Sequence, residues 1–471
     1  MIKNLRKEIS YLLVPSLLAI FIGYFISITS NYFFDLRYFL LVVIFLLISI
    51  PIVISITKKE FDILEIINLF LFLYFMAFFV KPILILIDED FVVLKHLYSG
   101  GKYFDLSLLA AIIGLLAFYS GYYSFKRERT KGYFNKGNIY KSSRAIVVVF
   151  MCIIGGIGGY LCLVYSSGGL TNFITSAFIG RGELFVGKGY ILIISFFCWL
   201  AVATCISYIY HKGGIFYKSL LFYMMFFTIL LIQSSYASRT ALLSIILIPI
   251  IYFHFRYRKI RLKKSLISII ILFTLLTTYD VYRQTEIGIS KYGGGTLKDI
   301  IKTSIGSSFA EIDGFSIILE QIPLQRDFFY GQVELEALIY PLIPRAIFPS
   351  KKIIWGTNLI QEVYIPNYQF TTYSVSILGP GYADFGWFGI IMNMFLLGFI
   401  SKYLFQKFKQ DPDNDGNLFL YIFFICNIVN IVRDGITVFL SQIPYLLAML
   451  LIFRYIQISR SIYPVKLGTT R

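Results

Sequence analysis

The stretch LRYFLLVVIFLLISIPIVISI occupies residues 36–56 and carries one charged side chain, Arg37, close to its start. An α-helix rises about 1.5 Å per residue, so roughly 20 apolar residues are needed to cross a hydrocarbon core about 30 Å thick. This stretch has the required length and almost no charge. It therefore predicts a membrane-spanning helix.

Apolar runs of this kind recur along most of the chain. The 471 residues are 58% hydrophobic and 15% charged, which is too apolar for a soluble multidomain protein. Runs between charged residues predict about twelve spanning helices, and hence an all-α polytopic membrane protein. The predicted spans lie near residues 11–29, 36–56, 64–87, 104–125, 145–165, 190–210, 216–233, 240–255, 265–282, 386–404, 417–432 and 435–453.

The charge distribution predicts how the chain is oriented. A net charge of +17 would suggest nucleic acid as a partner if the protein were soluble. Here most lysines and arginines fall on alternate connecting segments, and most acidic residues fall on the others. The positive-inside rule then places both termini in the cytoplasm. The basic excess is an orientation signal, so the expected partner is the lipid bilayer and no nucleic acid is expected.

The chain divides into three parts by composition. Residues 1–282 predict an N-terminal membrane bundle of about nine helices, and residues 373–471 predict about three more. Between them, residues 283–372 form an outer loop that is too long for a plain connection. Short amphipathic patterns at residues 307–322 and 331–342 predict helices that are partly re-entrant or lie on the surface around a cavity.

Cationic side chains on the predicted outer side are the first candidates for a binding site. Polar groups at membrane depth are costly and usually functional, and a guanidinium offers bidentate pairing to phosphate. Arg345 lies in YPLIPRAIFPS, residues 340–350, where three prolines stiffen the backbone. The alternative is that such residues reach lipid headgroups at the interface. The candidates for contact with a diphosphate are Arg181, Arg239, Arg283, Arg345, Lys351 and Arg433.

A general base on the outer side would have to be a carboxylate, because the one outward histidine, His96, lies in a different loop. Asp384 in GPGYADFGW, residues 379–387, lies at the mouth of a predicted helix, where partial burial would raise its pKa. The alternative is that Asp384 caps the helix beginning at Gly386. The other candidate bases are Glu311, Glu334 and Glu336, together with Asp313 and Asp434.

The sequence predicts neither a metal site nor a cofactor. The five cysteines all lie inside apolar runs, without the spacing of metal ligands. Metal-binding, nucleotide-binding and hydrolase motifs do not occur in a convincing context.

The order of these features resembles the Wzy-type oligosaccharide repeat-unit polymerases, which make O-antigen and capsular polysaccharide. The resemblance covers most of the chain. It rests on the number of spans, the long outer loop, ASRTAL at 237–242, IPR at 343–345 followed by Pro349 and Lys351, and GYADFGWFG at 381–389.

The resemblance implies a GT-C-like membrane glycosyltransferase in the bacterial cytoplasmic membrane, with its active site facing outward. Its substrates would be oligosaccharides linked to undecaprenyl diphosphate, and that diphosphate would be the leaving group. Arginines such as Arg239 and Arg345 would stabilise the charge that develops on it. A flippase and a chain-length regulator of the same pathway are implied as partners, and no metal is implied.

Three other functions remain open. An O-antigen ligase-like transferase would be expected to use an outward histidine, for which this chain offers no obvious equivalent. A flippase or other transporter would explain many spans and buried cations, but no repeat relates the two halves of the chain. A membrane scaffold without catalytic activity would not require arginines grouped on one face.

Overall fold

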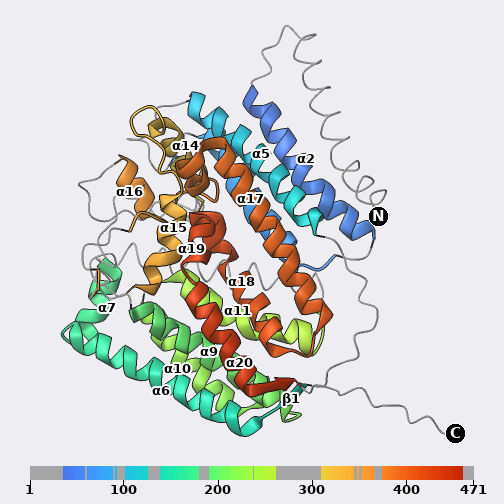
Figure 1. The fold of residues 1–471 in the computed structure, drawn as a ribbon, viewed down its shortest axis with the longest axis vertical. Helices are drawn as coiled ribbons and strands as arrows, with labels where there is room; N and C mark the ends of the chain where they lie inside the picture. Colours follow the sequence, from blue (N-terminus) through green and yellow to red (C-terminus); the bar gives the residue numbers. More distant parts are fainter. Residues whose placement is uncertain are drawn as a thin grey trace, which may run out of the picture. The chain divides into compact units, whose positions relative to one another are not determined.

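The computed structural model describes residues 36–58, 61–88, 91–92, 101–125, 138–179, 190–236, 238–260, 309–343, 347–348, 353–364 and 374–459. Within these ranges the regular structure is helical except for two short strands (Figure 1). The chain divides into two compact units. Unit 1 comprises Met1–Lys126, Ile260–Tyr403 and Asn427–Ile443, and unit 2 comprises Arg127–Lys259, Leu404–Cys426 and Pro444–Arg471.

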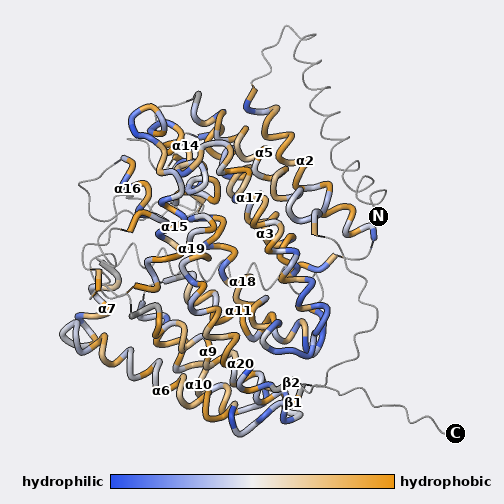
Figure 2. Tube along the Cα trace, in the orientation of Figure 1, coloured by the Kyte–Doolittle hydropathy of each residue, from blue (hydrophilic) through white to orange (hydrophobic). Residues whose placement is uncertain are grey.

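Seven helical segments of the described chain are long and apolar enough to cross a membrane, and Figure 2 shows hydrophobic residues along them. These segments are Leu36–Thr57, Ile66–Ile87, Tyr103–Ser124, Ser142–Ser166, Ile193–His211, Gly379–Gln410 and Asp415–Asp434. The prediction of a helical polytopic membrane protein is confirmed at this level. The total of twelve spans stays a prediction, and spans 11–29 and 265–282 lie outside the described residues.

Unit 1 is built from helices of very different lengths. They are α2 (Leu36–Thr57), α3 (Ile66–Phe75), the π-helix η1 (Met76–Val80), α4 (Lys81–Ile87), α5 (Gly101–Ser124), α14 (Glu311–Gln321), α15 (Gln332–Ile339), the 3-10 helix η5 (Tyr340–Leu342), α16 (Asn358–Tyr364), α17 (Gly379–Gln410) up to Tyr403, the end of α18 (Asp415–Asp434), and α19 (Ile436–Leu440).

Helices α5 and α17 cross in unit 1 at glycines that let their backbones touch. A Cβ atom at Gly121 would lie 2.0 Å from the carbonyl oxygen of Phe395, and one at Gly398 would lie 2.1 Å from that of Phe118. Small residues at such crossings are typical of membrane helices, where close packing drives association. Substitution of either glycine would force the two helices apart.

Helix α14 is an internal helix of unit 1. It packs against α5 and α16, and ten of its residues are buried, including Glu311 and Asp313. Helices α14 and α15 fall within the two ranges for which the sequence predicts short helices. The burial of α14 places its acidic first turn inside the protein.

Two predicted spans have a different form in the structure. Helix α17 starts at Gly379 and is kinked at Phe385 and Gly386, where the backbone is non-helical. The range 435–453 contains two helices, α19 and α20 (Ile443–Ile456). Gly435, with φ 85°, begins the first of these helices, and Pro444 lies in the first turn of the second. Glycine and proline are both common at helix N-termini. Each of these two residues starts a helix of its own, so the range does not form one continuous span.

Unit 2 contains the remaining described elements. They are β1 (Asn138–Tyr140), α6 (Ser142–Ser166), α7 (Leu170–Ile179), α9 (Tyr190–His211), the 3-10 helix η4 (Phe216–Lys218), α10 (Leu220–Ser235), α11 (Arg239–Arg256), the end of α17, the start of α18, α20, and β2 (Gln457–Ser459). Helix α6 packs along α9. Strands β1 and β2 pair antiparallel with Ile139 opposite Ile458, which joins the start of α6 to the end of α20.

Candidate functional site

The structure describes the side chains of seven of the twelve candidate site residues predicted from the sequence. They are Asp384, Glu311, Glu334, Glu336, Asp313, Asp434 and Arg433, and all of them belong to unit 1. Arg239 is the first residue of α11, but its side chain is outside the description. The predictions for Arg239 therefore stay predictions. The same holds for residues that lie outside the described ranges, namely Arg181, Arg283, Arg345 and Lys351.

Asp384 caps a helix that is distant in sequence. Its side chain is fully buried, and its two oxygens accept hydrogen bonds from the backbone N–H groups of Val333 and Glu334, each at 3.1 Å. These groups belong to the first turn of α15, whose N-cap residue, Gly331, has no side chain to cap it. A carboxylate is the preferred partner for such N–H groups. The sequence-based alternative placed this cap on the helix that follows Asp384, whereas the structure places it on α15.

The two glutamates of α15 are each held by neighbouring amides. Glu334 accepts a hydrogen bond from Nδ2 of Asn393, and burial raises the pKa of Glu334. Glu336 accepts hydrogen bonds from Nε2 of Gln332 at 2.7 Å and from the Tyr340 hydroxyl at 3.1 Å. Oε2 of Glu336 is buried without a hydrogen-bond partner.

A second group of charges surrounds the first turn of α14. Lys81 has no exposed side-chain surface, and its Nζ lies 3.5 Å from Oδ2 of the equally buried Asp313. Nζ also donates a hydrogen bond to the carbonyl oxygen of Phe91 at 2.6 Å. Lys81 directly follows the π-helix η1, a form that often occurs at functional sites.

Glu311 belongs to the same group and is only 3% exposed. Its Oε2 atom is buried without a hydrogen-bond partner. Burial raises the pKa of Glu311 to about 8, against the opposing influence of Arg433 and Lys81, while Asp434 adds to the rise. This carboxyl group can therefore gain or lose a proton near neutral pH.

Residues 374 and 375 connect α14 with the end of α18. A Cβ atom on Gly314 would lie 1.8 Å from the carbonyl oxygen of Ser374, so α14 touches this backbone directly. The Ser374 hydroxyl donates to the carbonyl oxygen of Arg433 at 2.5 Å. The N–H of Val375 donates to the carboxylate of Asp434. Residues 374 and 375 therefore contact both α14 and the Arg433–Asp434 pair.

Sequence reasoning assigned no role to Lys81. The structure shows that it is paired with Asp313, which lies more than 200 residues further along the chain. The signal in the sequence is a lysine followed by a proline inside an otherwise apolar run. A charge in such a run is a functional-site hypothesis in itself.

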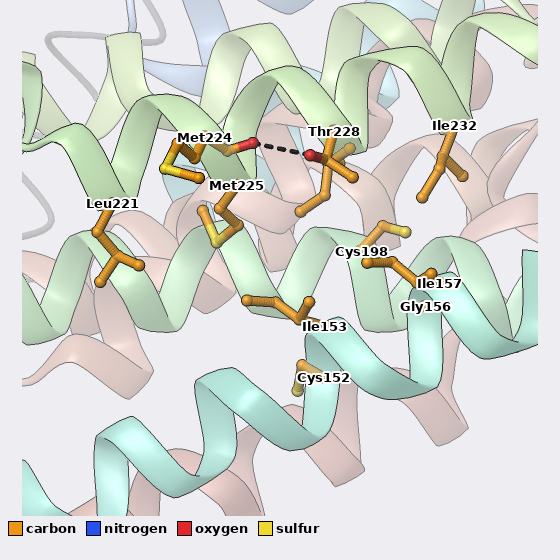
Figure 3. Close-up of a pocket in the computed structure, with 11 residues that line it drawn as sticks. Cys152, Ile153, Gly156, Ile157, Cys198, Leu221, Met224, Met225, Thr228 and Ile232 are labelled. Atoms are coloured by element: carbon orange, nitrogen blue, oxygen red, sulfur yellow. Dashed lines mark hydrogen bonds between the residues drawn. The ribbon is translucent and has the colours of Figure 1, made fainter.

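Unit 2 contains an apolar cavity of about 200 Å³ between α6, α9 and α10 (Figure 3). Its lining includes Cys152, Cys198, Met224, Met225 and Ile232. The hydroxyl of Thr228 faces it but donates to the carbonyl oxygen of Met224 at 2.8 Å (Figure 3). Such a cavity suits hydrocarbon, and none of the predicted site residues is among its described lining residues.

Metal ligands are not grouped in the described part of the chain. Across those ranges no three His, Cys, Asp or Glu side chains are placed so as to hold one ion. Three of the carboxyl groups described in unit 1 instead have other partners: Asp313 pairs with Lys81, Glu336 with the Gln332 amide and Asp384 with backbone N–H groups.

Comparison with known proteins finds one family model and two curated relatives. A family model described as "Domain of unknown function (DUF8712)" matches residues 303–411. The "O-antigen polymerase" of Salmonella typhimurium is 30% identical over 104 residues, and that of Salmonella typhi matches equally. This chain is similar to O-antigen polymerases over 21% of its length. It spans 25% of the length of each relative. No solved structure matches.

Proposed function

We propose that this protein polymerises lipid-linked oligosaccharide repeat units into a surface polysaccharide such as O-antigen or capsule. The observation that carries the proposal is the 30% identity to two O-antigen polymerases over 104 residues. The seven candidate membrane spans support it, because they would hold the enzyme in the bilayer that also carries a lipid-linked substrate. The enzyme would be a GT-C-like glycosyltransferase of the bacterial cytoplasmic membrane, with both termini inside and its site facing outward.

The reaction joins two substrates carried on undecaprenyl diphosphate. A hydroxyl oxygen of the incoming unit forms a bond to the anomeric carbon of the growing glycan, and the bond from that carbon to the diphosphate oxygen breaks. The electron pair leaves with the lipid diphosphate, and the hydroxyl proton passes to a base. A flippase and a chain-length regulator of the same pathway would act before and alongside this step.

Cations would stabilise the leaving diphosphate, because its charge grows as the bond breaks. Arg433 is supported by geometry. It lies in the last turn of α18 with one third of its side chain exposed, and its Nε lies 3.8 Å from Oδ1 of Asp434. We assign the same task to Arg181, Arg239, Arg283, Arg345 and Lys351 on the basis of the sequence.

Asp384 has a positioning role in this proposal. Both of its oxygens accept N–H groups of α15, so the residue fixes the first turn of the helix that carries Glu334 and Glu336. Among the other predicted bases, Glu311 combines an oxygen that is buried without a hydrogen-bond partner, a feature it shares with Glu336, with a pKa that burial raises to about 8.

The test uses the full chain in lipid nanodiscs. Its substrate is the lipid-linked repeat unit extracted from host cells that lack this protein. We expect a ladder of products spaced by whole repeat units, without nucleotide sugar or divalent metal. Transport of the lipid-linked unit across liposomes with no ladder would support a flippase and overturn the proposal. Transfer of finished glycan to a second lipid, without a ladder, would support a ligase.

Variants of Arg345 test the assignment of the cations. Loss of a charge-assisted contact costs about 1.5–3 kcal/mol, which is roughly one to two decades in rate. Arg345→Lys should also be impaired because lysine lacks the bidentate fork. Arg454→Ala, in the last turn of α20, is the control. Full polymerisation by a well-expressed Arg345→Ala variant would remove this residue from the site.

A further inference from the structure

Helix α15 has an inverted polarity, with its acids directed into the protein and its large apolar side chains directed outward. Glu336 is buried, and Glu334 accepts a hydrogen bond from Nδ2 of Asn393 on α17. Leu335 is 56% exposed, and Ile339, one turn further on, is exposed as well. A helix on the surface of a soluble protein shows the reverse arrangement.

The outward apolar side chains form a stripe that continues into η5. Leu335, Ile339 and Leu342 follow one another at spacings of four and three residues, which places them on one helical face. Leu342 is 61% exposed. The remaining exposed residue of α15, Gln332, donates its amide N–H to Oε1 of Glu336 at 2.7 Å. The face is therefore apolar over its whole length after the first residue of the helix.

The position of α15 along α17 gives its depth. Nζ of Lys402 on α17 donates to the Tyr122 hydroxyl at 3.4 Å, and that hydroxyl donates to Oε1 of Glu65 at 2.8 Å. Tyr122 and Glu65 lie at the ends of two further candidate spans, so the three side chains mark one polar edge of the spanning region. Asn393 precedes Lys402 by nine residues. At about 1.5 Å per residue this is about 13 Å, nearly half of a hydrocarbon core about 30 Å thick.

The packing of α5 against α17 gives the same level. A Cβ atom on Gly114, in the middle of the candidate span of α5, would lie 3.4 Å from Met394 and 3.6 Å from Ile390. Asn393 lies between these two residues in the sequence of α17, and its amide binds Glu334. The first turn of α15 is therefore level with the middle of a span.

The start of α15 also lies beside the exposed side of α17. A Cβ atom on Gly331, the residue before α15, would lie 3.0 Å from Cζ of Phe385. Phe385, Phe388 and Ile391 of α17 are all exposed. Because α17 is a candidate span, these apolar side chains would face lipid, and α15 begins next to them.

We propose that the stripe of Leu335, Ile339 and Leu342 contacts the hydrocarbon chains of bilayer lipids, so that α15 is a re-entrant helix at membrane depth. The inverted polarity is favourable there, because the apolar side chains meet an apolar solvent and the two acids find their hydrogen bonds inside the protein. This contact goes beyond the proposed function and does not depend on it.

The chain has to leave this depth after η5. Irregular backbone exposed to hydrocarbon has no partners for its polar groups. The Tyr340 ring lies 5.9 Å from that of Phe348 and 6.0 Å from that of Trp355, measured between centroids, and tyrosine and tryptophan are enriched at the membrane–water interface. We therefore expect the surroundings to change from hydrocarbon to water between Leu342 and Ile347, which is 76% exposed.

Nitroxide spin labels on single cysteines test the proposal. The full chain is placed in nanodiscs made only of phosphatidylethanolamine and phosphatidylglycerol, so that hydrocarbon contact comes from the bilayer. Cys162→Ala is the background, because Cys162 is the exposed one of the five cysteines and the other four are buried. Labels at Leu335→Cys, Ile339→Cys and Leu342→Cys should collide more often with oxygen, which concentrates in hydrocarbon, than with a water-soluble nickel complex.

Two positions with similar exposure are the controls. Ile154→Cys reports hydrocarbon, because Ile154 lies in the middle of α6 and is 66% exposed. Asp413→Cys reports water, because the side chain of Asp413 is 73% exposed. The ratio of oxygen to nickel collisions at the stripe should match that of Ile154→Cys and exceed that of Asp413→Cys several-fold. Ile347→Cys should give a ratio between the two controls.

Two results would overturn the proposal. A ratio at the stripe equal to that of Asp413→Cys would show that this face lines a water-filled cavity. Few collisions with either reagent would show that a second copy or another protein covers it. If Leu335→Cys fails to fold, Ile339→Cys and Leu342→Cys report on the same stripe. The collisions require no substrate, so they decide the lipid contact whether or not a polysaccharide ladder forms.

Discussion

Each of the two units has a cluster of polar side chains around a buried acid, and the buried carboxylates of the two clusters differ in how completely they are hydrogen-bonded. In unit 2 the fully buried Asp415 accepts hydrogen bonds from the Ser207 hydroxyl and from Nη2 of Arg256, and its Oδ2 lies 3.0 Å from Nε2 of His211. Its backbone N–H donates to Oε1 of Gln457 at 3.0 Å. Four elements of unit 2, α9, α11, α18 and β2, are tied to this one residue.

In unit 1, Glu311 is almost as deeply buried, yet its Oε2 has no hydrogen-bond partner. A satisfied buried network stabilises a fold, whereas an unsatisfied buried acid costs stability. Residues that cost stability are common where a protein needs chemistry. We therefore propose a structural role for the Asp415 cluster and a chemical role for the Glu311 cluster.

The largest effect is expected from Asp415→Ala, which would leave Arg256 buried without its carboxylate. Removal of one partner from a buried ion pair costs about 3–5 kcal/mol. Thermal unfolding followed by size-exclusion chromatography should show severe destabilisation. Asp413→Ala is the control, because Asp413 lies 3.2 Å from the same guanidinium but is 73% exposed, and its loss should cost about 1 kcal/mol or less. Equal effects of the two variants would contradict the structural role of Asp415.

Asp384→Ala should have the next largest effect, because it uncaps the first turn of α15. The loss of hydrogen bonds to a charged group costs about 1.5–3 kcal/mol, and Asp384→Asn, which keeps one acceptor oxygen, should lose less. Polymerisation should weaken while the shape of its pH profile is retained. A variant with wild-type stability, no activity and an altered profile would instead restore Asp384 as the base.

Glu311→Gln should change stability in the opposite direction. The pKa of this carboxyl group is about 8 in the folded protein, above its ordinary value, so folding disfavours the ionised form. The cost is absent at acid pH, where both states are protonated, grows as pH rises, and is greatest above about 8. The variant should therefore be more stable than the wild type by about 1–3 kcal/mol at alkaline pH. A variant that is destabilised at alkaline pH would contradict the comparison.

The smallest effect is expected from His211→Gln in the Asp415 cluster. Asp415 keeps its hydrogen bonds with Ser207 and Arg256 in this variant, so the expected loss is about 0.5–1.5 kcal/mol. The unfolding temperature of His211→Gln, compared with that of Asp415→Ala, measures how much of the stability of the cluster depends on His211. A loss as large as that of Asp415→Ala would show that His211 is the main partner.

The long helices could be predicted because length and hydrophobicity alone decide them. Residues 36–56, for example, fill one described helix, α2, almost completely. The kink in α17 and the break between α19 and α20 were not predicted. The kink depends on backbone conformation at Phe385 and Gly386, and the break lies directly before Pro444 in the first turn of α20; apolar periodicity reveals neither.

The site was predicted less completely than the fold because it depends on contacts between distant segments. The sequence identified Asp384 as a residue at a helix mouth, but its contact with the N–H groups of Val333 and Glu334 requires the tertiary structure. Lys81 and Asp313 are likewise far apart in sequence. The roles of Arg181, Arg239, Arg283, Arg345 and Lys351 stay predictions.

The pairing of β1 with β2 has a practical consequence for mapping which loops face the cytoplasm. Nested truncations fused to a reporter enzyme would all end before Gln457, and would thus remove the strand that pairs with Asn138–Tyr140. They would also remove the side chain that accepts the N–H of Asp415. Reporters or labelling cysteines placed within the full-length chain keep both contacts, so the sidedness they report belongs to the intact protein.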